Sequence, residues 1–499
     1  MTAPWWKTGV VYQIYPRSFL DTNGDGVGDL EGIRRRLDHL VWLGVDAVWL
    51  SPVFRSPMKD FGYDVADYCD VDPLFGTLAD LDRLAAEAHA RGLRVLLDWV
   101  PNHTSDQHPW FVESRCARTS PKRDWYVWRD PAPGGGPPNN WTAAFPLGTA
   151  AWTLDSASGQ YYLHQFLPEQ PDLNWANADV VAAMHDVVRF WLDRGIDGFR
   201  VDVVHGIGKN PRLPDEPPER TGIPHAALNE QPSTHEHLRA LRRLVDAYPG
   251  DRLLVGELFQ LFSSALERYV GTNDELHLAF DLPASVVTPW TAPAWRERIA
   301  SVAARLDPLG AWPTWVLSNH DTPRHRSRFG SEARARAAAV MLLTLRGTPF
   351  LYAGEELGLE DAEVPRERQV DPGGRDGCRA PIPWDASGTH GWATAQPWLP
   401  WPPEPAGRSR ERLTAEPKSI LHLYRRLLRA RRASPALQTG ALVVRDAPTP
   451  VLAYERRADG ERWTVLVNFA QETVACPANG AIVVASDGVG EGSRYAGKL

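Results

Sequence analysis

The feature that most constrains the fold is a repeated alternation of short apolar runs with segments of helical spacing. Helical segments follow the runs, as at Leu30, Ile33, Leu37 and Leu40, where apolar residues recur at intervals of three and four. Such alternation predicts parallel strands joined by crossover helices. The expected strands are residues 10–15, 47–51, 94–100, 198–204, 253–258, 276–281, 314–320 and 348–353.

Eight strands in this pattern predict an α/β protein with a closed (β/α)8 TIM barrel. In such a barrel the active site lies at the carboxyl ends of the strands. The competing architecture is an open, doubly wound sheet. It is disfavoured because no glycine-rich phosphate-binding turn follows the first strand.

Two segments depart from the alternation. Residues 104–169 are rich in Pro, Gly and Trp, and we expect them to form an inserted domain B after the third strand. The barrel would then comprise residues 1–103 and 170–430. Residues 431–499 contain alternating strand patterns with Asp459-Gly460 as a hairpin turn, which predicts a small C-terminal antiparallel β domain.

Composition narrows the class of partner. The formal net charge is -8 and there is no run of Lys and Arg, which argues against a nucleic-acid partner and favours a neutral substrate. The 21 Trp residues favour carbohydrate, because indole rings stack on sugar faces, although core packing accounts for many of them. Four scattered Cys, no signal-peptide pattern and no apolar stretch long enough to span a bilayer predict a cytoplasmic protein without a membrane partner.

One strand carries a charged pair suited to catalysis. Arg200 and Asp202 are two residues apart, so their side chains point to the same side of the strand. A guanidinium beside a carboxylate favours the ionised form, which a nucleophile needs. A structural ion pair is an equally good interpretation of this pair taken alone.

Two further carboxylates lie at predicted strand ends. Glu257 ends the run LLVGEL, next to apolar residues that favour the protonated form a general acid requires. Asp321 follows another apolar strand, where capping of a helix or turn is the alternative interpretation. If the barrel closes, Asp202, Glu257 and Asp321 converge, and two carboxylates flanking a glycosidic bond can carry out a retaining double displacement.

Four segments in this order and spacing resemble the signature regions of glycoside hydrolase family 13, the α-amylase family. They are DWVPNH (98–103), GFRVDVVH (198–205), GELF (256–259) and SNHD (318–321). A fifth, QPDLNW (170–175), is similar to the stretch that closes the inserted domain in the oligosaccharide-acting α-glucosidase branch, which includes oligo-1,6-glucosidases.

The resemblance implies a retaining, exo-acting α-glucosidase that releases terminal glucose from short sugars. It makes Asp202 the nucleophile, Glu257 the acid/base and Asp321 the transition-state stabiliser. It also implies sugar-binding roles, with Asp60 gripping the non-reducing end beside Arg379, or beside Arg375 from the same loop. The remaining expected sugar contacts are His103, Arg200 and His320 as ligands and Tyr63 as a stacking platform.

The sequence does not decide which glycosidic linkage the enzyme cleaves, or whether water or a second sugar accepts the glucose. Val203 follows the expected nucleophile, and in similar enzymes Val there accompanies α-1,6-linked substrates, whereas the rest of the chain is similar to α-glucosidases of broader range. Oligo-1,6-glucosidase is therefore the main alternative, and transglycosylases or sugar isomerases are others on the same scaffold. The non-enzyme alternative, a binding protein similar to transporter heavy chains, is disfavoured because all three acids are present and a membrane span is missing.

The loop DTNGDGVGD (21–29) has two interpretations. Oxygens of Asp21, Asn23, Asp25 and Asp29 resemble the start of a Ca2+ loop, and the family has ions at the matching position, so a structural Ca2+ or Mg2+ is one expectation. The other is a turn that caps the following helix. No cofactor is expected to be required for catalysis, and the lack of His-Cys or His-x-x-His spacing argues against a catalytic metal.

Overall fold

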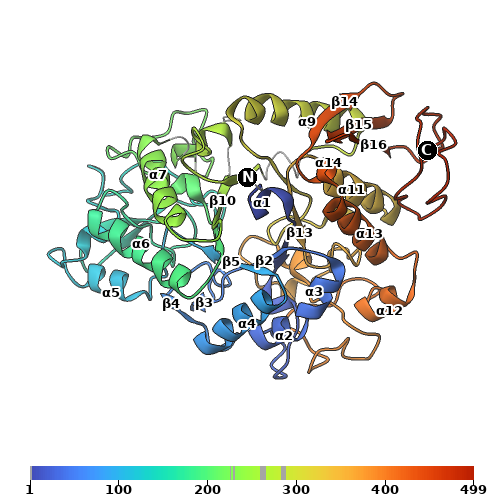
Figure 1. Ribbon diagram of the computed structural model, residues 1–499. Coiled ribbons are helices and arrows are strands. Elements are labelled where there is room, and N and C mark those ends of the chain that lie inside the picture. The colour runs from blue at the N-terminus through green and yellow to red at the C-terminus, as the bar shows by residue number, and fades with distance from the viewer. Residues whose placement is uncertain (1–2, 225, 229–230, 259–265, 282–287) are drawn as a thin grey trace.

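Eight parallel strands form the central sheet of the protein (Figure 1). The computed structural model describes residues 3–224, 226–228, 231–258, 266–281 and 288–499. The strands follow the order β11-β10-β9-β5-β2-β1-β13-β12. They are β1 (Val11–Ile14), β2 (Ala47–Leu50), β5 (Arg94–Trp99), β9 (Gly198–Val201), β10 (Leu253–Leu258), β11 (Leu278–Asp281), β12 (Thr314–Val316) and β13 (Thr348–Tyr352).

The two end strands of this order are neighbours in space. The hydroxyl of Thr314 in β12 donates a hydrogen bond of 2.8 Å to the carbonyl of Ala279 in β11. The sheet therefore curves round into a barrel, and the predicted (β/α)8 architecture is confirmed. Each expected strand is present, most of them one to four residues shorter at the ends than the apolar run.

Helices follow the strands around the outside of the barrel (Figure 1). The single helix expected through Leu30–Leu40 is divided at Arg36, whose φ of -108° and ψ of 5° interrupt it between α2 and α3. The main helices are α2 (Leu30–Arg35), α3 (Leu37–Leu43), α4 (Leu78–Ala90), α6 (Ala178–Asp193), α7 (Pro232–Asp246), α9 (Ala292–Leu306), α11 (Glu332–Thr344) and α13 (Ile420–Ala433).

Strand alternation separates two apolar layers. Val11, Trp49, Leu96 and Val255 belong to a buried cluster inside the barrel, which Trp5 and Trp6 of the N-terminal helix α1 (Trp5–Thr8) join. Residues one position along, such as Tyr12, Val48, Leu50 and Val95, pack instead in the larger core that also contains the apolar faces of the helices. The inward positions nearer the carboxyl ends, two residues further along β5 and β10, are polar, which creates a charged site above an apolar floor.

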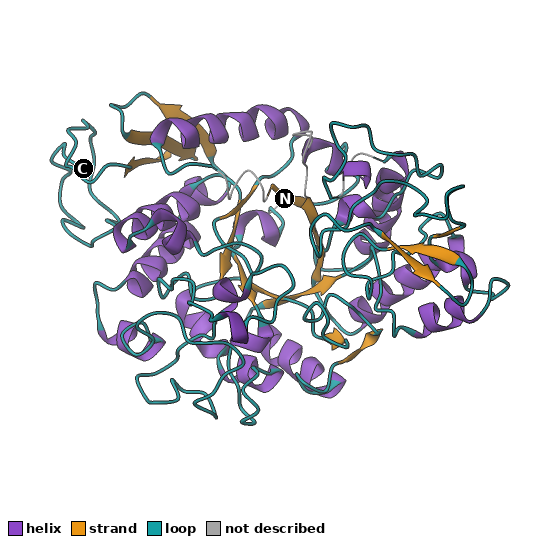
Figure 2. Ribbon diagram, turned by 180° about the vertical axis from the view of Figure 1, so that it is seen from behind, coloured by secondary structure: helices purple, strands orange, loops and turns teal. Residues whose placement is uncertain are grey.

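Two small sheets flank the barrel (Figure 2). Domain B contains α5 (Pro109–Cys116) and the antiparallel strands β6 (Trp128–Arg129), β7 (Trp152–Asp155) and β8 (Gln160–Leu163), where the sequence indicated only loops. At the C-terminus, β14 (Ala441–Arg445), β15 (Val451–Ala458) and β16 (Glu461–Asn468) form an antiparallel sheet. Asp459 and Gly460, with φ of 48° and 79°, make the predicted hairpin turn.

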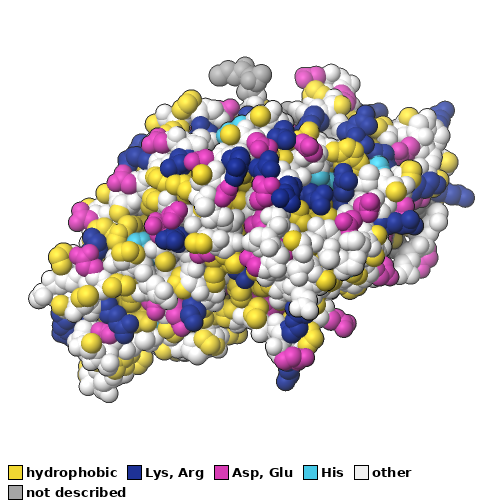
Figure 3. Space-filling view, turned by 90° about the horizontal axis from the view of Figure 1, so that it is seen from below, with side chains coloured by type: hydrophobic (Ala, Val, Ile, Leu, Met, Phe, Trp, Pro, Cys, Tyr) yellow, Lys and Arg dark blue, Asp and Glu magenta, His cyan; other side chains and the backbone are white. Residues whose placement is uncertain are grey.

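The surface is mixed in charge. On the face in Figure 3, Lys and Arg side chains lie among Asp and Glu side chains over much of the area. Within the described part of the chain, no helix is both long enough and apolar enough to cross a bilayer.

Candidate active site

One buried guanidinium organises the carboxyl ends of β5, β9 and β10. Asp98 of β5 and Arg200 of β9 are register partners, so the two side chains enter the barrel at the same height. Arg200 is 1% exposed and its Nη1 lies 2.7 Å from Asp98 Oδ1 and 2.6 Å from Asp202 Oδ1. Its Nη2 lies 2.7 Å from Glu257 Oε2. Three carboxylates from three strands thus meet around one cation.

The backbone turns sharply after Asp202. Val203 has a φ of 41° and a ψ of 46°, a left-handed conformation that a β-branched residue rarely adopts. This turn ends β9, and the Val203 N–H donates a hydrogen bond of 3.2 Å to Glu257 Oε2. The strained position therefore fixes Asp202 and Glu257 relative to each other, and both expected catalytic acids face the same space.

The group formed by Arg200, Asp98, Asp202 and Glu257 has more carboxylates than cations. Burial raises the pKa of Asp202, Arg200 opposes that shift, and repulsion from Glu257 adds to it. Burial also raises the pKa of Asp98 to about 6, against the same guanidinium. One cation thus faces three carboxylates, and Arg200 is the group that favours their ionised forms.

Asp321 joins the group from the loop after β12. Its Oδ1 lies 2.9 Å from Arg375 Nη1 and 3.2 Å from Arg379 Nη2, and its Oδ2 lies 3.3 Å from His320 Nε2. Burial acts to raise its pKa, but the guanidinium groups of Arg375 and Arg379 outweigh burial and hold the pKa well below its ordinary value. The alternative capping role belongs to Asn319, whose side-chain oxygen accepts from the Asp321 N–H and the Thr322 hydroxyl.

A chain of neutral groups lines the floor of the site. His320 Nδ1 lies 2.7 Å from Gln13 Nε2, and its ring stacks on Tyr63 at 5.5 Å between centroids. Burial lowers the pKa of His320 to about 3, so the imidazole is uncharged at neutral pH. The Tyr63 hydroxyl donates to Asp98 Oδ2 at 3.0 Å. These contacts fix ring faces and hydrogen-bonding groups in the way that sugar recognition requires.

His103 lies on the wall that domain B provides. Its Nε2 is 3.1 Å from the Tyr63 carbonyl and 3.1 Å from Gln170 Nε2, and the Phe166 ring packs against it at 5.1 Å. Gln170 also donates to Asp60 Oδ2 at 3.1 Å. The sequence had drawn attention to Gln170 only through the QPDLNW motif, and here it connects two of the expected sugar ligands.

Arg375, and not Arg379, is the partner of Asp60. Arg375 Nη2 lies 2.8 Å from Asp60 Oδ1, whereas Arg379 pairs with Asp371 at 2.9 Å and donates from its Nε to the His320 carbonyl. The expected Asp60–Arg379 pairing is therefore corrected. The two arginines differ in burial. Arg379 is fully buried, whereas the Arg375 side chain keeps 14% exposure. Arg375 also lies over the Phe145 ring of domain B at 4.9 Å, which closes this end.

Comparison with known proteins decides the family. The catalytic domain of α-amylase matches residues 13–440 of the chain. The chain belongs to the α-amylase family. A probable α-glucosidase of Rhizobium meliloti (strain 1021) is 44% identical, over 94% of this chain and 90% of that protein. An oligo-1,6-glucosidase of Parageobacillus thermoglucosidasius is 38% identical, over 95% and 92%.

Two solved structures superimpose on nearly the whole chain. An α-glucosyl transfer enzyme superimposes with a TM-score of 0.92 at 41% identity, covering 97% of this chain and 96% of that chain. A trehalulose synthase variant gives a TM-score of 0.92 at 36% identity, covering 100% and 98%. The similar proteins thus include both hydrolases and enzymes named for making glycosides.

The site of this α-amylase-family chain contains residues that the sequence did not single out. Gln13 and Asp371 contact His320 and Arg379, and neither lies in one of the five motifs. Asp98 was noted only as part of DWVPNH, yet it is a direct partner of Arg200. Phe259, the last residue of the GELF motif, lies outside the described residues.

The carboxylates of Asp21 and Asp29 in the 21–29 loop accept hydrogen bonds from nearby backbone N–H groups. Asp21 accepts backbone hydrogen bonds from Asn23, Gly24 and Gly26, and Asp29 accepts from Gly32 as the N-cap of α2. Among the described residues, no group of three or more His, Cys, Asp or Glu side chains is arranged to hold a metal ion. The carboxylates act here as turn and helix caps, and the expectation of a structural ion stays a prediction.

Proposed function

We propose that this chain is a retaining, exo-acting α-glucosidase that releases terminal α-linked glucose from disaccharides and short oligosaccharides. The observation that carries the proposal is the contact of Arg200 with both Asp202 and Glu257, at 2.6 and 2.7 Å, at the ends of adjacent barrel strands. Two carboxylates held this way can act on one glycosidic bond. The names of the similar proteins, α-glucosidase and oligo-1,6-glucosidase, support the same class.

The reaction follows from the geometry in two steps. In the first, Asp202 attacks the anomeric carbon while Glu257 gives its proton to the departing oxygen, so a glucosyl ester forms and the glycosidic bond breaks. In the second, Glu257 takes a proton from water, whose oxygen attacks the anomeric carbon and displaces Asp202. Asp321, kept ionised by Arg375 and Arg379, stabilises the positive charge that develops on the sugar.

Asp60, Arg375 and Phe145 close one end of the site, which favours cleavage at the end of a sugar chain. Asp60 and Arg375, with Phe145 over the guanidinium, block extension of a chain beyond the glucose that contacts His103 and His320. The carboxylate of Asp60 and the guanidinium of Arg375 are groups that form charged hydrogen bonds with sugar hydroxyls. A terminal glucose fits such a site, whereas the interior of a polysaccharide does not.

An α-glucosidase of broad linkage range is our first candidate, and an oligo-1,6-glucosidase is the main alternative because Val203 follows Asp202. Glucosyl transfer is a second candidate function, favoured by the likeness to an α-glucosyl transfer enzyme at 41% identity. In transfer, a sugar hydroxyl replaces water in the second step. We further propose a cytoplasmic location, in keeping with the free thiols of Cys69, Cys116, Cys378 and Cys476.

The test is glucose release from maltose, isomaltose, trehalose and sucrose by the wild-type protein and by Asp202→Asn. We expect cleavage of at least one sugar, and a loss of kcat of roughly a thousandfold or more in the variant, because the nucleophile is removed. Asp186→Asn, on the exposed surface of α6, is the matched control and should match the wild type. Comparable turnover by Asp202→Asn would refute the proposed nucleophile, and longer sugars among the products would establish transfer.

We also propose that a structural Ca2+ or Mg2+ binds the 21–29 loop through carboxylate and amide oxygens, the ligands such cations prefer. Binding to the folded state would raise Tm by mass action. Excess EDTA is then expected to lower Tm by several degrees, and added Ca2+ or Mg2+ to restore it. An unchanged Tm in EDTA, together with an unchanged Tm for Asp25→Asn, would favour the capping interpretation alone.

A further inference from the structure

Lys209 is a buried cation that contacts both the loop after the nucleophile and the wall of domain B. Its side chain is 7% exposed. Its Nζ donates to Asn102 Oδ1 at 3.0 Å and to the Gly206 carbonyl at 2.9 Å, and it lies 3.1 Å from Asp172 Oδ2. All three are acceptors, which matches the three donors of an ammonium group. The proposed reaction does not use Lys209, so its burial at this place needs another explanation.

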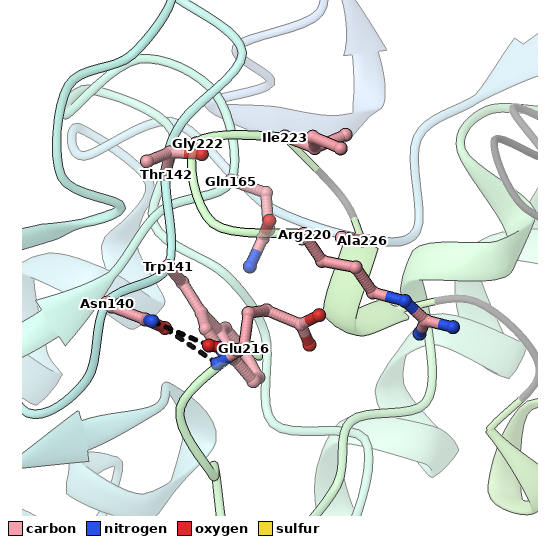
Figure 4. A pocket seen from close by; sticks show the side chains of 9 residues that line it. All are labelled: Asn140, Trp141, Thr142, Gln165, Glu216, Arg220, Gly222, Ile223 and Ala226. Carbon is pink, nitrogen blue, oxygen red and sulfur yellow. Dashed lines mark hydrogen bonds between the residues drawn. The ribbon is translucent and has the colours of Figure 1, made fainter. Parts of the chain in front are cut away.

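The segment that carries Lys209 is joined to domain B by hydrogen bonds. Asn140 Nδ2 donates to the Glu216 carbonyl at 2.8 Å, and Asn140 Oδ1 accepts from the Glu216 N–H at 2.7 Å (Figure 4). Nearer to Lys209, Asn139 Nδ2 donates to the Leu213 carbonyl at 3.0 Å. These contacts hold the segment against domain B, so the ammonium group of Lys209 has a fixed position.

The neighbours of Asn102 determine how its amide group is oriented. Asn102 Oδ1 faces the ammonium group of Lys209, which can only donate, and Asn102 Nδ2 lies 3.3 Å from Asp172 Oδ1, which accepts. The reversed amide would place an NH2 group beside a cation and an oxygen beside a carboxylate. The side chain also has little room to move, because a Cβ at Gly206 would lie 2.8 Å from Asn102 Oδ1.

The orientation of Asn102 fixes the proton of the adjacent His103. Asn102 Nδ2 lies 3.0 Å from His103 Nδ1, and this donor requires that Nδ1 accept. On the other edge of the ring, His103 Nε2 lies 3.1 Å from the Tyr63 carbonyl, which can only accept, so Nε2 donates. Gln170 Nε2 lies 3.1 Å from the same ring nitrogen and donates to Asp60 Oδ2. The proton therefore lies on Nε2, the edge that faces the end of the site where the terminal glucose is proposed to bind.

We propose that Lys209 and Asn102 are positioning residues, which hold His103 in the tautomer that presents its Nε2 proton to an oxygen of the bound sugar. The inference rests on the proposed α-glucosidase function, because the sugar is the ligand that receives this hydrogen bond. The other tautomer would direct a lone pair at both the sugar oxygen and the Tyr63 carbonyl. Lys209 thus influences sugar binding through Asn102 without touching the sugar.

A purely structural ion pair with Asp172 is the competing role for Lys209. Burial raises the pKa of Asp172, and the charge of Lys209 opposes that shift. Removal of this charge lets Asp172 take up a proton, so both charges that orient the Asn102 amide are lost together. We expect the amide then to occupy two orientations and the His103 proton to divide between Nδ1 and Nε2. A purely structural role predicts lower stability with the His103 proton still on Nε2.

Nitrogen-15 NMR of protein labelled at the histidine rings tests the proposal, because protonated and unprotonated ring nitrogens give separate signals. The His103 signals are those that disappear in His103→Gln. In the wild type we expect an unprotonated Nδ1 and a protonated Nε2. In Lys209→Met, about half of the protein or less should keep the proton on Nε2, and kcat/KM for the preferred disaccharide should fall by the same factor.

Asn102→Asp is the second variant and keeps the shape of the side chain. Its carboxylate accepts where the amide donates, so Nδ1 of His103 is expected to gain a proton. His164 is an internal reference, since its Nδ1 lies 2.9 Å from the Phe166 carbonyl and should stay protonated in every variant. Lys122→Met, which removes a surface ion pair of domain B, is the matched control and should change neither the His103 signals nor kcat/KM.

A proton on Nδ1 of His103 in the wild type would overturn the proposal. So would an unchanged tautomer in both Lys209→Met and Asn102→Asp, even with a loss of activity, because that result indicates a structural role alone. A changed tautomer in Lys209→Met with an unchanged kcat/KM would overturn it as well. If the wild type cleaves no sugar, the proposed function itself fails, and the spectra, which need no sugar, still decide whether Lys209 positions His103.

Discussion

Arg200 is the residue on which the geometry of the site depends. It is fully charged and planar, so it can contact Asp98 and Asp202 from one nitrogen and Glu257 from the other. Lys has one donor centre and could not span three strands. The spacing of two between Arg200 and Asp202 was visible in the sequence, but the partners from β5 and β10 come only with closure of the barrel.

At the same scale, Arg375 is expected to govern binding of the terminal glucose. Arg375→Lys keeps the charge but loses the forked contact with Asp60 and Asp321, so we expect kcat/KM to fall by about 10- to 100-fold, mainly through KM. Steady-state kinetics with the preferred disaccharide measures this. Arg366→Lys, exposed in the same loop, is the control. A larger rise of KM in Arg379→Lys than in Arg375→Lys would reinstate Arg379 as the gripping residue.

At the scale of elements, the turn after β13 buries the carboxyl group of Glu355, and burial favours the protonated form of that group. Glu355 is 2% exposed, and neither of its carboxylate oxygens has a hydrogen-bond partner among the described residues. His325 Nδ1 lies 3.9 Å from Glu355 Oε1. Burial raises its pKa from 4.5 to about 8. The folded state therefore binds this proton more tightly than the unfolded state, and the resulting stability is complete below pH 4.5 and lost as pH rises through 8.

Glu355→Gln is expected to remove the loss of stability at high pH, because the neutral amide has no proton to lose in the buried site. Tm of the variant should approach or fall below that of the wild type at pH 5 and exceed it by roughly 1–3 °C at pH 9. Thermal unfolding at both pH values measures the difference. Glu363→Gln, exposed beyond the same turn, should show no such crossover. A constant difference between wild type and Glu355→Gln at every pH would contradict the argument.

Elements also show what sequence alone can predict. Eight strands and their order along the chain follow from local apolar patterns, and so do the positions of Asp202, Glu257 and Asp321 at strand ends. The sheet of domain B was missed because its strands pair antiparallel within a segment rich in Pro and Gly, so they do not follow the alternation of strand and helix that revealed the barrel. The sequence could not decide whether Arg375 or Arg379 pairs with Asp60, because the two partners in the observed pair, Arg375 and Asp60, are 315 positions apart.

At the scale of the whole molecule, a buried arginine of the C-terminal sheet binds the end of a barrel helix, and a second buried arginine binds the same helix end. Arg456 of β15 donates to the Thr344 carbonyl at 2.6 Å and to the Gly440 carbonyl at 3.0 Å. Arg431 of α13 donates to the carbonyls of Leu343 and Gly347. Both cations lie at the C-terminal end of α11, where unpaired carbonyls and the helix dipole attract positive charge.

Arg456→Met is therefore expected to destabilise the protein by about 2–4 kcal/mol, because two buried carbonyls lose a charged donor. Urea unfolding followed by tryptophan fluorescence measures the change. Arg462→Met, exposed on the neighbouring strand β16, is the control and should change stability by less than about 0.5 kcal/mol. Equal stability of Arg456→Met and Arg462→Met would show that the C-terminal sheet contributes nothing through this contact.

The central claim is that distant acids meet at one anomeric carbon and that Asp202 forms the bond to it. Trapping tests this most directly: the protein is incubated with a 5-fluoro-α-glucosyl fluoride, digested and analysed by mass spectrometry. We predict one fluoroglucosyl group on Asp202 in the wild type, more slowly released in Glu257→Gln and absent in Asp202→Asn. A label on any other residue, or release of glucose with inverted anomeric configuration and no label at all, would contradict it.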